Sequence, residues 1–180
     1  GELGVEVLTI AGNHDSAERL ASCAGLLDKA GLYLQGAAQR EPRVVEFADS
    51  QVFFLPWMTE EKIKSLYPEE RDGITDLTEA CRVAVNHMRE KFIPGKHHLL
   101  LSHAFITNSE TPISVRAAEI GFATQVPASV FEGFDYVALG HIHKPQQVNP
   151  HVRYSGSPMA YSFGKEERQE KSVTLIDTAA

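Results

Sequence analysis

Long apolar runs are missing from this sequence. No stretch approaches the roughly 18 consecutive apolar residues that indicate a membrane-spanning helix. The first residues, Gly1-Glu2-Leu3-Gly4, have neither the basic start nor the apolar stretch of a signal peptide. We therefore expect a cytoplasmic chain with no membrane partner.

Cysteine is also scarce. The two cysteines, Cys23 and Cys81, lie within helical apolar patterns and form no Cys-x-x-Cys motif. We expect both to be small buried hydrophobic residues in a reducing compartment. A metal site built on thiolates is excluded by this spacing.

Basic side chains are fewer than acidic ones. The chain has 17 Lys and Arg against 24 Asp and Glu, a formal net charge of -7 and a sequence pI of about 5.6. Such a surface does not hold nucleic acid by counterion release alone. Any contact with DNA would be local, mediated by a metal or helped by a partner. With 180 residues, 43% of them apolar, we expect one domain around one core.

Short apolar runs alternate with helical patterns, which predicts an α/β fold. Strands are predicted at residues 5–11, 32–34, 43–47, 52–55, 99–103, 136–139, 146–148, 152–155 and 172–177. The first is apolar enough to be covered on both faces. Helices are predicted at residues 16–29, 59–67 and 76–92, with a helical turn at 128–131.

Two local features complete this prediction. Asp15 is placed to cap the helix that follows it. Residues 104–127 lose all periodicity, and Arg116 within them is a candidate for contact with DNA or a partner, with an ordinary surface loop as the alternative.

Three of the predicted strands end in histidine or in asparagine followed by histidine. The residues are Asn13 and His14, His103, and the pair His141 and His143. Side chains that follow strands of an α/β sheet gather at one edge, where ligand sites form. In an extended segment, His141 and His143 would lie on the same side. Nitrogen and oxygen donors without thiolates favour manganese, iron or zinc.

The remaining histidines have ordinary explanations. His97 and His98 precede a strand and are expected to face solvent, His87 lies on the polar side of a helix, and His151 lies in a turn.

These motifs resemble those of a known superfamily. Gly12-Asn13-His14-Asp15, His103 at its strand end and Gly140-His141-Ile142-His143 are similar to the third, fourth and fifth motifs of the calcineurin-like metallophosphoesterases. The wider context at residues 10–20, 134–146 and 153–158 resembles the SbcD nuclease subunits within it. The resemblance covers essentially the whole chain and implies the calcineurin-like fold, with mixed sheets flanked by helices.

The resemblance also implies a role for each site residue. Asn13, His103 and His141 match ligands of one metal ion, and His143 matches a ligand of a second. His14 matches the catalytic histidine, and Asp15 is a possible supporting residue. The complete site would hold two divalent ions, with Mn²⁺ expected.

Two motifs of the superfamily are absent. No Asp-x-His and no Gly-Asp dipeptide occurs in the 180 residues. The resemblance therefore implies that residues 1–180 form a partial, N-terminally truncated nuclease domain without its first two βα units. Because the bridging carboxylate would belong to the absent part, we expect weak or no catalysis by the chain alone.

The implied activity is that of a metal-dependent DNA exonuclease and endonuclease in repair and recombination. Its implied partners are DNA and an SbcC-type ATPase subunit, with the full-length protein a homodimer within a heterotetramer. Two alternatives stay open: another phosphodiesterase or phosphatase of the superfamily, and a non-catalytic docking module for an ATPase.

Overall fold

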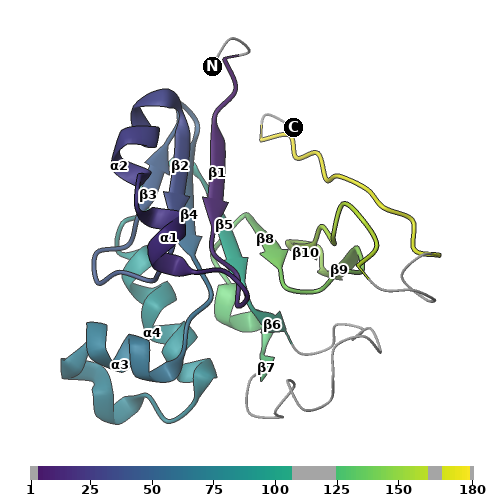
Figure 1. The fold of residues 1–180 in the computed structure, drawn as a ribbon. Helices are drawn as coiled ribbons and strands as arrows, with labels where there is room; N and C mark the ends of the chain where they lie inside the picture. The colour runs from purple at the N-terminus through teal and green to yellow at the C-terminus, as the bar shows by residue number, and fades with distance from the viewer. Residues whose placement is uncertain (1–3, 107–124, 162–167, 179–180) are drawn as a thin grey trace.

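The computed structural model describes residues 4–106, 125–161 and 168–178. Its largest element is a six-stranded mixed sheet in the order β3-β4-β5-β8-β10-β9 (Figure 1). The strands are β3 (Val44–Glu46), β4 (Ser50–Leu55), β5 (His97–His103), β8 (Tyr136–Gly140), β9 (Gln146–Asn149) and β10 (Val152–Tyr154). The four inner strands run parallel, and β3 and β9 are antiparallel edges. The predicted α/β class is confirmed.

Two smaller sheets flank this one. β1 (Val7–Ile10) pairs in parallel with β2 (Leu32–Gln35), and β6 (Phe105–Ile106) pairs in parallel with β7 (Gln125–Val126). The latter pair lies at the two ends of the stretch that the sequence predicts to be irregular. Arg116 lies outside the described residues.

The helices are short except for one. They are α1 (Ala17–Ala21), α2 (Ala24–Leu27), α3 (Glu60–Leu66) and α4 (Leu77–Arg89), with 3-10 helices η1 (Asp28–Ala30), η2 (Pro68–Gly73) and η4 (Ala128–Phe131). Both longer helices begin as expected, because Thr59 and Asp76 accept the backbone N–H of Lys62 and Glu79. No helix of the described residues is long and apolar enough to span a membrane.

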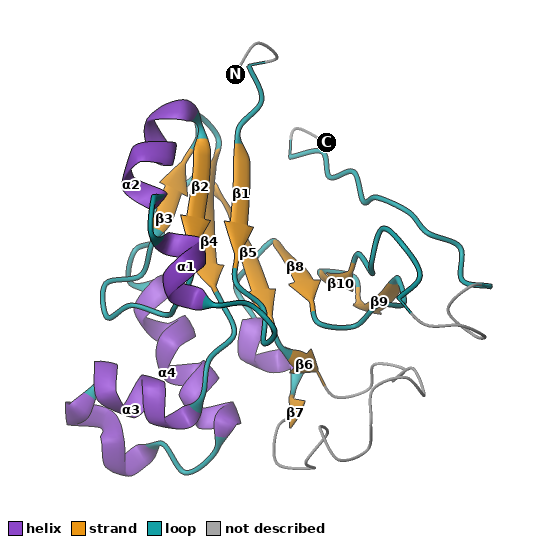
Figure 2. Ribbon diagram, viewed as in Figure 1, coloured by secondary structure: helices purple, strands orange, loops and turns teal. Residues whose placement is uncertain are grey.

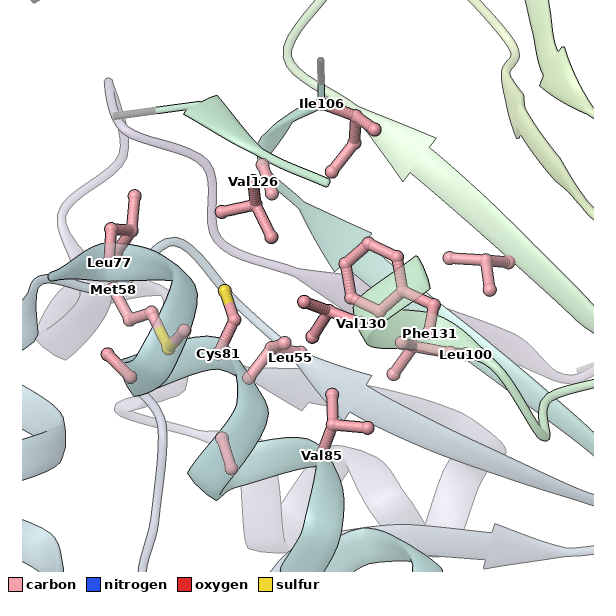
Figure 3. Close-up of a cluster of buried hydrophobic side chains, with 14 of the residues drawn as sticks. Leu55, Met58, Leu77, Cys81, Val85, Leu100, Ile106, Val126, Val130 and Phe131 are labelled. Atoms are coloured by element: carbon pink, nitrogen blue, oxygen red, sulfur yellow. The ribbon is translucent and has the colours of Figure 1, made fainter. Parts of the chain in front are cut away.

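The core lies between α4 and one face of the large sheet. A row of neighbours across the four parallel strands is almost fully buried: Phe53, Leu100, Val137 and Val152. Against it α4 packs its apolar side, including Leu77, Cys81 and Val85 (Figure 3). Burial on this scale is the main stabilising term of the fold.

Tyr154 ties the core to the end of β5. It is fully buried, and its hydroxyl donates to the carbonyl of Ala104 (2.7 Å) and accepts from the N–H of Ile106 (2.9 Å). The segment that follows His103 is thereby fixed to β10.

Several local predictions are wrong. The helix predicted at 16–29 breaks at Ser22 and Cys23 into α1, α2 and η1, so the apolar stripe does not continue and Cys23 is exposed. β1 pairs only with β2, so Val7 is exposed instead of covered. β5 begins at His97, and the ring of His98 stacks on Phe92 with centroids 3.7 Å apart instead of facing solvent.

The strand predicted at 172–177 is also absent. This segment is a loop, with Val173 and Leu175 each 94% exposed (Figure 2). Its link to the sheet is a side-chain bond from Arg153 Nε to Thr174 Oγ1 of 3.2 Å. Alternating apolar residues form a strand only where a partner strand accepts their backbone hydrogen bonds.

The two cysteines should differ sharply in reactivity. Cys23 is exposed, whereas Cys81 is buried in the core and burial raises the pKa of its thiol to about 12. We expect a maleimide probe to label one thiol per folded chain at pH 7.5 and two in denaturant. The Cys23→Ser variant should not be labelled while folded, and rapid labelling of that variant would contradict the buried position of Cys81.

Candidate metal centre

The candidate site lies where three strands end. β5 and β8 pair in parallel with His103 opposite Gly140, so His103 and His141 are brought together at the carboxyl edge of the sheet. β1 reaches the same edge, because the Ala11 carbonyl accepts the backbone N–H of Trp57 just beyond β4 (3.0 Å). The predicted gathering of strand ends is thus present for these elements.

The loop after β1 is a tight turn. The Asp15 carboxylate accepts the N–H of Gly12 at 2.7 Å, and the Asp15 N–H donates to the Gly12 carbonyl at 3.3 Å. Asp15 therefore closes the loop on itself. The prediction that Asp15 caps the helix is wrong, because Ser16 occupies the N-cap of α1.

This turn directs Asn13 toward His103. The Asn13 Oδ1 and the His103 Nε2 lie 2.9 Å apart. An amide oxygen and an imidazole nitrogen are both ligands for borderline divalent metals. The pair therefore aims two metal-type donor atoms at the same point in space.

The His103 ring is held between two glycine backbones. A Cβ added to Gly12 would lie 2.6 Å from His103 Cε1, and one added to Gly140 would lie 2.9 Å from His103 Nδ1. Any side chain at either position would displace the ring. Each glycine precedes a candidate ligand in the sequence, and the need for close packing explains why glycine stands there.

His103 is neutral at physiological pH. Burial lowers its pKa to about 4, with further lowering from the positive charges that His141 and His14 could carry and a smaller opposing effect of Asp15. A neutral imidazole keeps a lone pair available for a metal. The donor chemistry of Asn13 and His103 therefore fits a divalent cation.

His141 has an unusual backbone. Its φ of 100° makes it the only non-glycine residue with positive φ in the described part of the chain. Such a conformation costs about 1–3 kcal/mol and is found mostly at functional sites. The bend also means that 141–143 is not the extended segment predicted from the His-x-His spacing.

Aromatic rings surround His141. Trp57 stacks on it with centroids 5.6 Å apart and an interplanar angle of 19°, and His103 meets it edge-on at 5.2 Å. Trp57 also approaches His103 edge-on at 6.0 Å. The sequence prediction missed Trp57, although its position directly after β4 at the same sheet edge was a usable signal.

His143 is positioned by the last motif. Its carbonyl accepts the N–H of Ser157 (3.0 Å) and the Lys171 ammonium (3.4 Å), and its ring lies 5.2 Å from that of Tyr161. Gly156, at φ 78°, packs so closely on Pro145 that a Cβ would approach it to 2.7 Å. These contacts give residues 153–158 a structural role next to the Gly-His-Ile-His motif.

The candidate residues do not form one complete cage. Asn13, His103 and His141 are in mutual contact, and His14 is close enough to influence the pKa of His103. Among the described residues, no three His, Cys, Asp or Glu side chains gather closely enough to hold a metal ion. The group in contact therefore consists of one amide and two imidazoles.

Comparison with known proteins found two clear matches among curated proteins, both named as the SbcD component of the nuclease SbcCD. The chain is 30% identical over 177 residues to the protein of Staphylococcus epidermidis and 33% identical over 186 residues to that of Bacillus subtilis. These matches cover 98% and 95% of this chain and 46% of each relative. The chain thus spans about half the length of these relatives. No family model matches it.

The contact of Gly12 with His103 can be tested by adding one methyl group. We expect Gly12→Ala to lower the free energy of unfolding by about 1–3 kcal/mol, because the methyl group overlaps the His103 ring. Gly25→Ala is the matched control: a Cβ there has nothing within 4 Å, and alanine should be neutral or stabilising in α2. Urea unfolding measures both, and equal effects of the two variants would contradict the close packing of His103.

Proposed function

Because this chain is an SbcD-like segment, we propose that it supplies part of the metal site of a calcineurin-like metallophosphoesterase domain that hydrolyses DNA phosphodiesters. The observation that supports this most directly is the meeting of Asn13 and His103, 2.9 Å apart, beside the strained and stacked His141. These are three of the residues whose motifs resemble the superfamily, and they come from strands far apart in the sequence.

The residues divide into ligands and a proton donor. Asn13, His103 and His141 hold one divalent ion, and His143 belongs to a second, with Mn²⁺ as the proposed metal. When bound, this pair of ions supplies Lewis acidity to the phosphodiester and lowers the pKa of water. Asp15 keeps the loop closed, so that Asn13 presents its oxygen beside His103.

His14 is the proposed catalytic residue. It follows a ligand in the same tight turn, and its charge acts on His103, so it lies beside the metal site. From there its imidazole donates a proton to the leaving sugar oxygen or a hydrogen bond to a phosphate oxygen.

Partners account for the charge of the chain. With a net charge of -7, it has too little positive surface to hold DNA alone, and the curated relatives are named as one component of a larger nuclease. We therefore include in the proposal an SbcC-type ATPase partner that supplies DNA affinity, a homodimer of the full-length protein within this complex, exonuclease and endonuclease activities, and a role in DNA repair and recombination.

The isolated chain should cleave linear DNA weakly or not at all with Mn²⁺. The carboxylate motifs that complete the superfamily site do not occur in its sequence. Robust cleavage by this chain that is lost in both Asn13→Ala and His14→Ala would show that its own residues suffice.

In the complete gene product that carries this chain, His14→Ala should lower Mn²⁺-dependent cleavage by about 10²–10⁴-fold while leaving Mn²⁺ binding intact. Asn13→Ala should weaken both. His97→Ala, which alters an exposed histidine at the opposite end of β5, is the control and should change neither. Undiminished cleavage by His14→Ala would overturn the role of His14, and hydrolysis of small diesters without DNA cleavage would favour another phosphodiesterase.

A further inference from the structure

Trp57 occupies a position that the proposed ligand set does not explain. It follows Pro56, which comes directly after β4, and its backbone N–H is bound to the carbonyl of Ala11 at the end of β1. Its backbone therefore joins the strand that leads to Asn13 with the large sheet that carries His103 and His141.

The indole contacts both imidazoles of the site. It lies nearly parallel to His141, with an interplanar angle of 19°, and nearly perpendicular to His103, with an angle of 84°. Since the two imidazoles also meet edge-on, the three rings form one packed group. Rotation of the His141 ring would break its stacking on Trp57.

The backbone of His141 makes such support necessary. A φ of 100° is unfavourable for histidine, so surrounding contacts must hold it. The ring contacts come from Trp57 after β4 and from His103 and Phe105 at the end of β5 and the start of β6. Of these, the Trp57 stack is the most nearly parallel, which fixes the plane of the imidazole.

We propose that Trp57 is a positioning residue that sets the plane of the His141 ring, so that its nitrogen faces the same point as Asn13 and His103. This inference rests on the proposed metal site, and it assigns to an aromatic side chain the orienting role that hydrogen-bonded neighbours usually play around metal ligands.

The chain itself supplies a probe. Trp57 is its only tryptophan, so all emission excited at 295 nm comes from the side chain stacked on His141. Paramagnetic Mn²⁺ quenches a nearby indole. We expect saturable quenching by Mn²⁺ in the parent chain and its loss in His141→Ala, with Mg²⁺ as a non-paramagnetic comparison.

Affinity separates positioning from general stability. Free Mn²⁺ measured by electron paramagnetic resonance should show about tenfold or weaker binding for Trp57→Ala and near-parent binding for Trp57→Phe, which keeps a ring that can stack. Trp57→Leu fills space without stacking and should bind as weakly as Trp57→Ala, so it replaces that variant if the latter does not fold. Circular dichroism establishes that each variant is folded.

A stack of the same kind outside the candidate site serves as control. His87 lies parallel to Tyr67 with centroids 4.2 Å apart, and His87→Ala should leave Mn²⁺ affinity unchanged. Parent-like affinity in folded Trp57→Leu would overturn the positioning role alone. Absence of Mn²⁺ binding by the parent chain would instead overturn the metal site, and the positioning role with it.

Discussion

The packing of the His103 ring between the backbones of Gly12 and Gly140 is the contact on which the candidate site depends. It brings together the end of β1, the end of β5 and the end of β8, and it leaves space for no side chain at either glycine. The same enclosure removes water from the ring and keeps it neutral. One steric fit therefore sets both the position of a donor atom and its protonation state.

Two separate sheets have to dock for this contact to exist. Asn13 follows β1 of the two-stranded sheet, whereas His103 and His141 follow strands of the six-stranded sheet. The bond between the carbonyl of Ala11 and the N–H of Trp57 links the two. The donors consequently come together through tertiary packing, and no single sheet contains all of them.

Sequence patterns predicted the elements that have strong local signals. The inner strands, the helix behind Asp76 and the histidines at strand ends were all anticipated, because apolar periodicity and capping residues act over a few positions. The failures occurred where distant contacts decide. Cys23 became exposed when its helix broke, and residues 172–177 found no partner strand. The role of Trp57 and the φ of His141 depend on neighbours more than 80 positions away, which local patterns cannot reveal.

The hydroxyl of Tyr154 extends the influence of the core to the site. It satisfies backbone groups on both sides of Phe105, directly after His103, although it is fully buried one strand beyond β8. Phenylalanine would fill the same volume and leave both groups unpaired. Tolerance to substitution at this interior position is therefore governed by chemistry more than by size, and a mutation that preserves hydrophobicity can still loosen the chain next to a candidate ligand.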